Sequence, residues 1–136
     1  RSLSHIYAQV IDDVSRTTWQ RFFDPAEPMH CDLAEVDGVV RGLVHSIDHR
    51  SCWMKEPSCY LQDLFVAPEL RGQGLGRALM AEGVAGCERQ WPSRAIRISA
   101  QTHLERFYAS LGFVRVGDDY LEDNIPHVEM LRSTPR

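Results

Sequence analysis

The sequence lacks the features that mark membrane, secreted or nucleic-acid-binding proteins. No apolar run approaches the roughly 18 residues of a membrane-spanning helix, and no signal-peptide pattern opens the chain. The four cysteines are scattered without a C-x-x-C pair, which favours reduced, mostly buried thiols. The net charge of −4 argues against a nucleic-acid binder, which usually carries a basic face. We therefore expect a cytoplasmic protein whose partners include neither nucleic acid nor a membrane.

The composition is that of one ordinary globular domain. Hydrophobic residues make up 43% and charged residues 25% of the 136 positions, and a chain of this length can bury a substantial core. The sequence holds no internal repeat and no low-complexity linker. We therefore expect a single domain over residues 1–136.

Two histidines raise the question of a metal site. His45 and His49 would lie on one face of the same strand if that strand runs far enough. No third ligand has a suitable spacing, so we expect no metal.

The most informative stretch is 60–79. An apolar strand over 60–66 leads through a short turn to an amphipathic helix, and three alternating glycines lie between them: Gly72, Gly74 and Gly76. Glycines at a strand-to-helix turn leave backbone N–H groups uncovered, and the helix N-terminus adds the positive end of its dipole. The stretch therefore predicts an anion site suited to a phosphate or pyrophosphate.

The spacing of these glycines excludes two familiar phosphate loops. A P-loop requires G-x-x-x-x-G-K-[ST], and no Lys-Ser or Lys-Thr follows the glycines. A dinucleotide fingerprint requires G-x-G-x-x-G, and Arg77 stands where its third glycine would be.

With a D-L-F-V-x-P strand end ahead of it, Arg71-x-x-Gly74-x-Gly76 resembles the Q/R-x-x-G-x-G/A pyrophosphate loop of the GNAT superfamily of acyl-CoA-dependent N-acyltransferases. The resemblance implies an α/β fold with a mixed central sheet flanked by helices. It also implies acetyl-CoA as cosubstrate, held by the glycine loop and by the backbone of the central strand. The cofactor-binding residues implied are Leu64, Phe65, Val66, Arg71, Gly72, Gln73, Gly74, Leu75, Gly76 and Arg77.

Helical patterns occur in four places. Periodicity predicts helices over 3–14 and 15–23, the second ended by Asp24-Pro25. The helix after the glycine loop carries one apolar stripe and ends at Pro92, and Thr102-x-x-Glu105 is a capping box that opens another helix. Most GNAT domains begin with a strand ahead of the first helix. Almost nothing precedes Leu3, so we expect that strand to be absent.

Strand patterns complete an α/β sandwich. A hairpin is expected where two strands meet at Asp37-Gly38, a favoured turn pair. The late segment between the last two strands is expected to be a loop rich in acids. The predicted strands are 31–36, 39–47, 60–66, 95–100, 113–116 and 127–131.

Two branches of the superfamily are resembled by different parts of the chain. From about Gly76 to Arg132 it is similar to the ElaA-like branch, through A-Q at 100–101, L-E-R-F-Y-A-S-L-G-F at 104–113 and Y-L-E-D-N-I-P-H at 120–127. The first half, over 16–66, is more similar to another branch of small bacterial GNAT proteins. A recombined chain is therefore a hypothesis.

The catalytic acid is implied by the resemblance. Tyr108 matches the tyrosine of F-Y-x-x-x-G-F that protonates the departing thiolate in many GNAT proteins. A phenol of pKa near 10 donates to a thiolate only when local fields help. The alternative is that Tyr108 is a core aromatic, since it lies on the apolar helix face.

The catalytic base is left open among several residues. Y-L-Q-D-L-F-V resembles the Y-L-E-D-F-F-V of spermidine/spermine N-acetyltransferases, but Gln62 replaces the glutamate and cannot take a proton. Gln62 could still hold a water, and Asp63 points to the other face. Glu122, Asp123 and His127 remain, and histidine has the most useful unperturbed pKa, about 6.5. The alternative to a catalytic role is that Glu122 and Asp123 are simply solvated loop acids and that His127 only caps a strand.

The expected function is transfer of an acetyl group from acetyl-CoA to a primary amine by direct attack in a ternary complex. Acids near the proposed site would attract a cationic amine, either a small molecule or a peptide. We place Tyr108, His127 and Glu122 as catalytic, and Gln62 and Asp123 as substrate-binding. The alternative is a catalytically idle acyl-CoA-binding module, suggested by Gln62 and the missing first strand. An exposed sheet edge would favour a homodimer.

Overall fold

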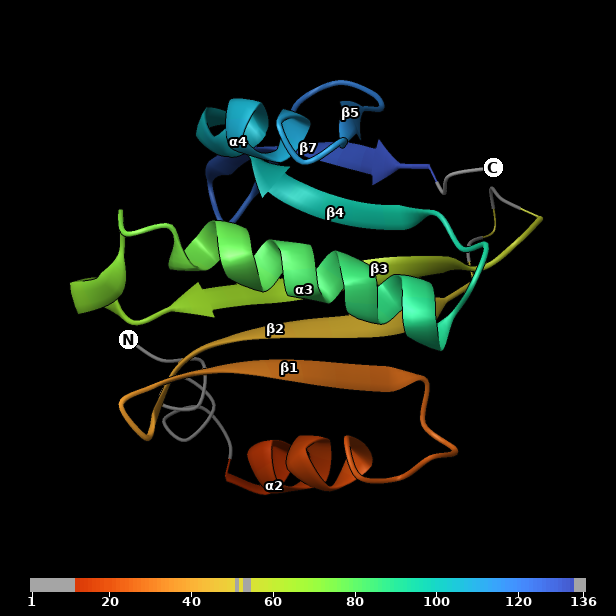
Figure 1. Ribbon diagram of the computed structural model, residues 1–136. Helices are drawn as coiled ribbons and strands as arrows, with labels where there is room; N and C mark the ends of the chain where they lie inside the picture. Colours follow the sequence, from red (N-terminus) through yellow and green to blue (C-terminus); the bar gives the residue numbers. More distant parts are fainter. Residues whose placement is uncertain (1–11, 51, 53–54, 134–136) are drawn as a thin grey trace.

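The computed structural model describes residues 12–50, 52 and 55–133, which form a mixed sheet flanked by helices (Figure 1). The strands pair in the order β1-β2-β3-β4-β7-β5, with β6 also paired to β7. All neighbours are antiparallel except β3 and β4, which are parallel. The predicted α/β fold is therefore confirmed. The strands are β1 (Met29–Val36), β2 (Val39–His49), β3 (Ser58–Val66), β4 (Ile96–Gln101), β5 (Val114–Arg115), β6 (Tyr120–Glu122) and β7 (Ile125–Arg132).

The helices lie around this sheet, and α3 runs across one of its faces (Figure 1). Short 3₁₀ turns precede two of them. In the described ranges no helix is long and apolar enough to cross a membrane. The helical segments are α2 (Asp12–Arg21), η1 (Pro68–Leu70), α3 (Leu75–Gln90), η2 (Thr102–Leu104) and α4 (Glu105–Ala109).

The N-terminal helix differs from the prediction. A junction was expected between residues 14 and 15, but α2 runs unbroken from Asp12 to Arg21, because no proline or glycine interrupts that stretch. The chain then turns ahead of Asp24-Pro25 as expected. The rest of the predicted helix over 3–14, and the place of the expected missing strand, lie outside the described residues.

The β1–β2 hairpin is confirmed. Asp37 and Gly38 both have positive φ, 52° and 76°, as the tight turn between antiparallel strands requires. The first strand begins two residues earlier than predicted, at Met29, and β2 continues to His49.

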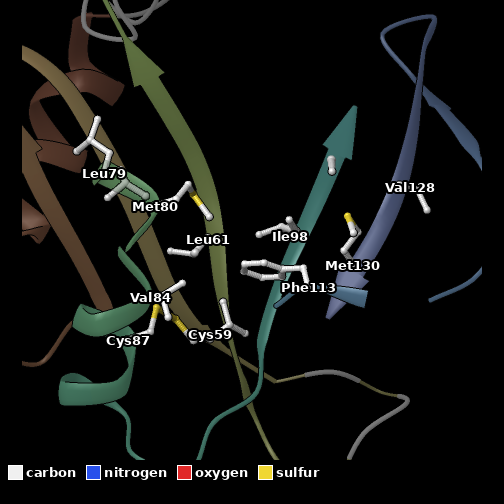
Figure 2. Packing of buried hydrophobic residues seen from close by; sticks show 13 residues of the cluster. Cys59, Leu61, Leu79, Met80, Val84, Cys87, Ile98, Phe113, Val128 and Met130 are labelled. Atoms are coloured by element: carbon white, nitrogen blue, oxygen red, sulfur yellow. A yellow bond between two sulfur atoms is a disulfide. The ribbon is translucent and has the colours of Figure 1, made fainter. Parts of the chain in front are cut away.

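Helix α3 packs its apolar stripe on the sheet and closes the core. Met80, Val84 and Cys87 are buried as the periodicity predicts, and the helix ends at Gln90, just before Trp91-Pro92. Figure 2 shows α3 side chains meeting Leu61 of β3, while Phe113 and Met130 lie beside Ile98 of β4. Gly83 allows α3 to pack closely on Val44 of β2, because a Cβ at position 83 would lie 3.2 Å from both methyl groups of Val44.

The cysteines correct the expectation of reduced thiols. Cys59 of β3 and Cys87 of α3 form a disulfide inside the core, with Cα atoms 6.3 Å apart (Figure 2). They are 28 residues apart in sequence, so only the packing of α3 on β3 brings them together. Cys31 and Cys52 are the free cysteines of the described part of the chain.

The prediction of a capping box at Thr102 and Glu105 is wrong. A 3₁₀ turn occupies residues 102–104, and α4 begins at Glu105 without a side-chain cap. The Thr102 hydroxyl donates to the Pro126 carbonyl at 3.3 Å, and Glu105 pairs with Arg115 at 2.8 Å. Tertiary contacts therefore take both side chains that the local motif would have used.

The expected acid-rich loop contains a strand. Residues 120–122 form β6 and pair with β7 across a turn at Asp123-Asn124, where both residues have positive φ. Asparagine and aspartate tolerate that region, so this dipeptide was the available signal for a hairpin. The turn brings Glu122 back over His127.

Candidate active site

A break in strand pairing opens the sheet at its centre. The β2–β3 register shifts between His45 and Ser46, whose partners are Asp63 and Leu61, so Gln62 is a bulge. Strands β3 and β4 pair only at their first residues and separate beyond Tyr60. A cavity of about 240 Å³, here called the β3–β4 cavity, lies where they diverge. Its lining includes Gln62, Leu64, Ser99, Tyr108 and His127.

Tyr108 enters this cavity from α4. Its ring makes edge contacts with Phe107 and Phe113, at centroid distances of 5.0 and 6.2 Å. Burial raises the pKa of the phenol above its ordinary value of 10, so the group keeps its proton at neutral pH. No partner for its hydroxyl exists among the residues that the structure describes. The packed ring and the free hydroxyl make Tyr108 both a core aromatic and an available proton donor.

His127 enters from β7, and its hydrogen bonds define its tautomer. Nδ1 lies 2.7 Å from the carbonyl oxygen of Ile125. A carbonyl can only accept, so Nδ1 carries the proton, and Nε2 of the neutral ring holds a lone pair. His127 is 9% exposed, and Nε2 lies 3.4 Å from Glu122 Oε2. The ring can therefore accept a proton at Nε2, and the carboxylate would stabilise the resulting cation.

Hydrogen bonds connect Glu122 to neighbouring hydroxyl groups. The Ser99 hydroxyl donates to Glu122 Oε2 at 3.2 Å and also contacts the Tyr120 hydroxyl. The Tyr120 ring stacks on His127 with centroids 6.1 Å apart. Neither Ser99 nor Tyr120 was predicted as a site residue. They lie on different strands, β4 and β6, and only the pairing of both strands with β7 brings them together beside Glu122.

Two of the three expected loop glycines have positive φ, and the third, Gly76, already lies in the first turn of α3. Gly72 and Gly74 have φ of 78° and 84°, and Gly74 is the N-cap of α3 without any side-chain cap. The first intrahelical bond that closes on Gly74 comes from Ala78. The N–H groups of residues 75–77 therefore have no intrahelical acceptor and are available to an anion.

Two arginines flank this loop. The guanidinium of Arg71 donates to the Val66 carbonyl at 3.1 Å and lies 5.9 Å from the Phe65 ring centre. Arg77 donates to the Ser110 hydroxyl at 2.9 Å and lies over the Phe107 ring. Each guanidinium is thus held by a neighbouring oxygen and ring, and both come from residues of the loop and the first turn of α3, where positive charge favours a polyanionic ligand.

Comparison with known proteins identifies the family. The chain matches the acetyltransferase (GNAT) domain over residues 4–133. This chain belongs to the GNAT acetyltransferase family.

Curated relatives share part of the sequence. Protein ElaA of Escherichia coli is 41% identical over 69 residues, which are 51% of this chain and 45% of ElaA. The D-amino-acid N-acetyltransferase HPA3 of Saccharomyces cerevisiae is 34% identical over 70 residues, 50% of this chain and 44% of that protein. The matched segment thus covers less than half the length of these relatives.

A solved structure matches over the whole chain. The acyl-CoA N-acyltransferase from Pseudomonas aeruginosa has a TM-score of 0.71 at 30% identity, covering 98% of this chain and 93% of its own. Escherichia coli ElaA has a TM-score of 0.70 at 26% identity, covering 98% and 93%. An aminoglycoside 6'-N-acetyltransferase complexed with coenzyme A, 16% identical, shares the fold, with a TM-score of 0.71 over 98% of this chain and 88% of its own.

GNAT proteins use acyl-CoA, and the geometry of this chain fits such a ligand. Past Tyr60, β3 has no strand partner on its β4 side within the described residues. The backbone of Leu64, Phe65 and Val66 can therefore pair with an extended ligand on that side. The glycine loop lies at the end of the same strand. The Gln73 side-chain amide donates to the Glu69 carbonyl at 3.3 Å, so this side chain stabilises the conformation of the loop.

The other predicted site residues fall in different places. Gln62 is the exposed bulge residue and lines the β3–β4 cavity. Asp63 lines the same cavity, contrary to the expectation that it points to the other face, and its carboxylate is paired with His45 at 3.1 Å. Asp123 occupies the exposed hairpin turn and does not line that cavity. Over the described ranges, no cluster of three or more His, Cys, Asp or Glu could hold a metal.

Proposed function

We propose that this GNAT protein transfers an acetyl group from acetyl-CoA to a primary amine by direct attack in a ternary complex. The observation that carries the proposal is the β3–β4 cavity, which is lined both by a protonated phenol on α4 and by a histidine with a free Nε2 on β7. These are the acid and the base that acyl transfer to an amine requires.

Each residue has a defined task in the proposed reaction. His127 Nε2 accepts a proton from the incoming ammonium, and Glu122 stabilises the imidazolium that results. The freed amine attacks the thioester carbonyl carbon, and a backbone N–H of β3 polarises the carbonyl oxygen. The carbon–sulfur bond then breaks, Tyr108 gives its proton to the departing thiolate, and the phenolate so formed takes the second proton from the acylated nitrogen. Acetyl-CoA supplies only the activated acetyl group.

A second candidate is an idle acyl-CoA-binding module. It is favoured by Gln62, which cannot take a proton where a related sequence carries glutamate. His127 answers that objection, because its lone pair lines the same cavity.

The test combines calorimetric titration of acetyl-CoA with thiol release over a panel of amines. We expect binding, and turnover that His127→Gln lowers by about 10²–10⁴-fold without changing acetyl-CoA affinity. Tyr108→Phe should lower turnover in the same way. His103→Gln is the matched control, because His103 is exposed and does not line the β3–β4 cavity. Binding without thiol release from any amine would support the idle module, and absence of binding would refute both.

A homodimer remains a separate proposal. It is supported by β5 at the sheet edge, where Val114 is exposed, because unpaired edges favour strand association. A monomeric mass by light scattering at assay concentration would refute it.

A further inference from the structure

A second cavity, here called the Tyr60 cavity, adjoins the first on the other side of the sheet. Cys59 and Leu61 face α3, so the alternation of β3 directs Ser58 and Tyr60 to the opposite face. The cavity has a volume of about 230 Å³, and Ser99 lines both cavities. Of its lining residues, the acyl-transfer chemistry described above uses only Glu122, whose carboxylate lies beside His127.

Ser58 gives this cavity an unsatisfied polar group. Its side chain is fully buried, yet its hydroxyl has no hydrogen-bond partner among the described residues. A buried hydroxyl without a partner carries a desolvation cost, so such a group needs an explanation. Because Ser58 lines the cavity, a bound polar group would satisfy it.

The charges around the Tyr60 cavity favour a cation. Glu122 and Glu129 line it, and Arg97, the one arginine among its described lining residues, is already paired with Glu129. Burial, followed by the charges of Glu122 and other nearby groups, raises the pKa of Tyr60 despite the opposing effect of Arg97. Among the charges that act on the Tyr60 hydroxyl, those of Glu122 and Asp63 favour a nearby cation.

The aromatic lining has the same preference. The rings of Tyr60 and Tyr120 both border the cavity, and aromatic faces attract ammonium groups. At about 30 Å³ per water-sized group, the volume suits a few heavy atoms. A short alkylammonium therefore matches the size, the hydroxyl groups and the charge.

We propose that the Tyr60 cavity binds the remote ammonium of a diamine acceptor, while the reacting amine lies beside His127. This inference rests on the proposed acetyltransferase function and names its substrate class. Glu129 determines the specificity by pairing with Arg97, which keeps that arginine from attracting a carboxylate at the same place. The carboxylate of Glu122 then supplies the negative charge for the ammonium.

Three acceptors of matched length test the preference: 1,4-diaminobutane, butylamine and 4-aminobutanoate. Their chains differ only in whether the remote end is an ammonium, a methyl or a carboxylate. We expect kcat/KM to be highest for the diamine and lowest for the amino acid. Equal kcat/KM for diaminobutane and butylamine would overturn the proposal.

Glu129→Gln tests the selectivity at one residue. Losing the carboxylate and releasing Arg97 should lower the ratio of kcat/KM for diaminobutane to that for 4-aminobutanoate by at least about tenfold, the change expected for one charged contact. Glu82→Gln is the matched control, because Glu82 is an exposed α3 carboxylate paired with an arginine, Arg89. The proposal fails if both variants change the ratio equally.

Ser58→Ala separates a ligand role from a structural one. Removing a buried hydroxyl without a partner should not lower the melting temperature of the free protein, but it should weaken diaminobutane binding several-fold. Direct calorimetric titration of diaminobutane decides this even if no amine releases thiol. In that case the acetyltransferase proposal fails while the cation site stands. No binding of diaminobutane to the wild-type protein would overturn the site itself.

Discussion

Gly74 and Gly76 lie two residues apart in the glycine loop, yet alanine should have opposite effects at these positions. Gly74 has φ of 84°, which an L side chain rarely adopts, although a Cβ there would meet nothing within 4 Å. Gly76 lies in the first turn of α3 without positive φ, and its Cβ would meet only Val66 Cγ2, at an ordinary 3.8 Å. The family pattern Q/R-x-x-G-x-G/A also accepts alanine at the second position.

The magnitudes follow from the backbone. Gly74→Ala should lower the free energy of unfolding by about 1–2 kcal/mol, the cost of a left-handed non-glycine residue. Gly76→Ala should raise it by about 0.5 kcal/mol, the lower end of the helix preference for alanine over glycine. In a chain of this size each kcal/mol moves the melting temperature by roughly 3–5 °C.

Thermal unfolding and calorimetric titration of acetyl-CoA together measure both effects. Gly74→Ala should lower the melting temperature and weaken acetyl-CoA binding, because the loop must reorient its free N–H groups. Gly76→Ala should raise the melting temperature and leave binding unchanged. If both variants are destabilised alike, the difference in backbone conformation is wrong. If Gly76→Ala is stable but no longer binds acetyl-CoA, the ligand must lie directly against the backbone of Gly76, where it leaves no room for a methyl group.

Three further predictions concern other parts of the chain. Because burial raises the pKa of Tyr108 above 10, its phenol stays protonated below that pH. A fall in kcat between pH 7 and 10 that Tyr108→Phe abolishes would mean that Tyr108 loses its proton in this range, which would contradict the raised pKa. Gly42→Ala should cost about 1–3 kcal/mol in thermal unfolding, because its Cβ would lie 3.0 Å from the Phe65 carbonyl; an unchanged melting temperature would count against this tight packing. Burial and a neighbouring carboxylate raise the pKa of Cys31 to about 11, so iodoacetamide at pH 8 should alkylate exposed Cys52 first. Mass spectrometry would reveal the reverse order.

The glycine loop and the main strands could be predicted because their signals are local. A few neighbouring residues determine each of three features: the positive φ at Gly74, the turn at Asp37-Gly38 and the apolar stripe of α3. The family resemblance then supplied the sheet that joins them.

The remaining features depend on pairing across the sheet. The bulge at Gln62, the Cys59–Cys87 bond and the loss of the cap at Thr102 each arise from a partner distant in sequence. The sequence favoured His127 as base only for its unperturbed pKa. That His127 lines the cavity while Asp123 stays in the turn depends on the β6–β7 hairpin. Periodicity carries no information on such long-range register.

The hydrogen bond from His127 to Ile125 has a consequence for how this site can vary. The accepting group is a main-chain oxygen, which every amino acid possesses, so replacing the side chain at position 125 leaves the acceptor in place. In many enzymes, by contrast, a carboxylate holds the histidine, and a single codon change can remove it. Here the ring nitrogen that must stay free is determined by the shape of a hairpin. The proposed proton transfer at Nε2 of His127 can therefore be kept while substitutions accumulate at the other positions of that hairpin.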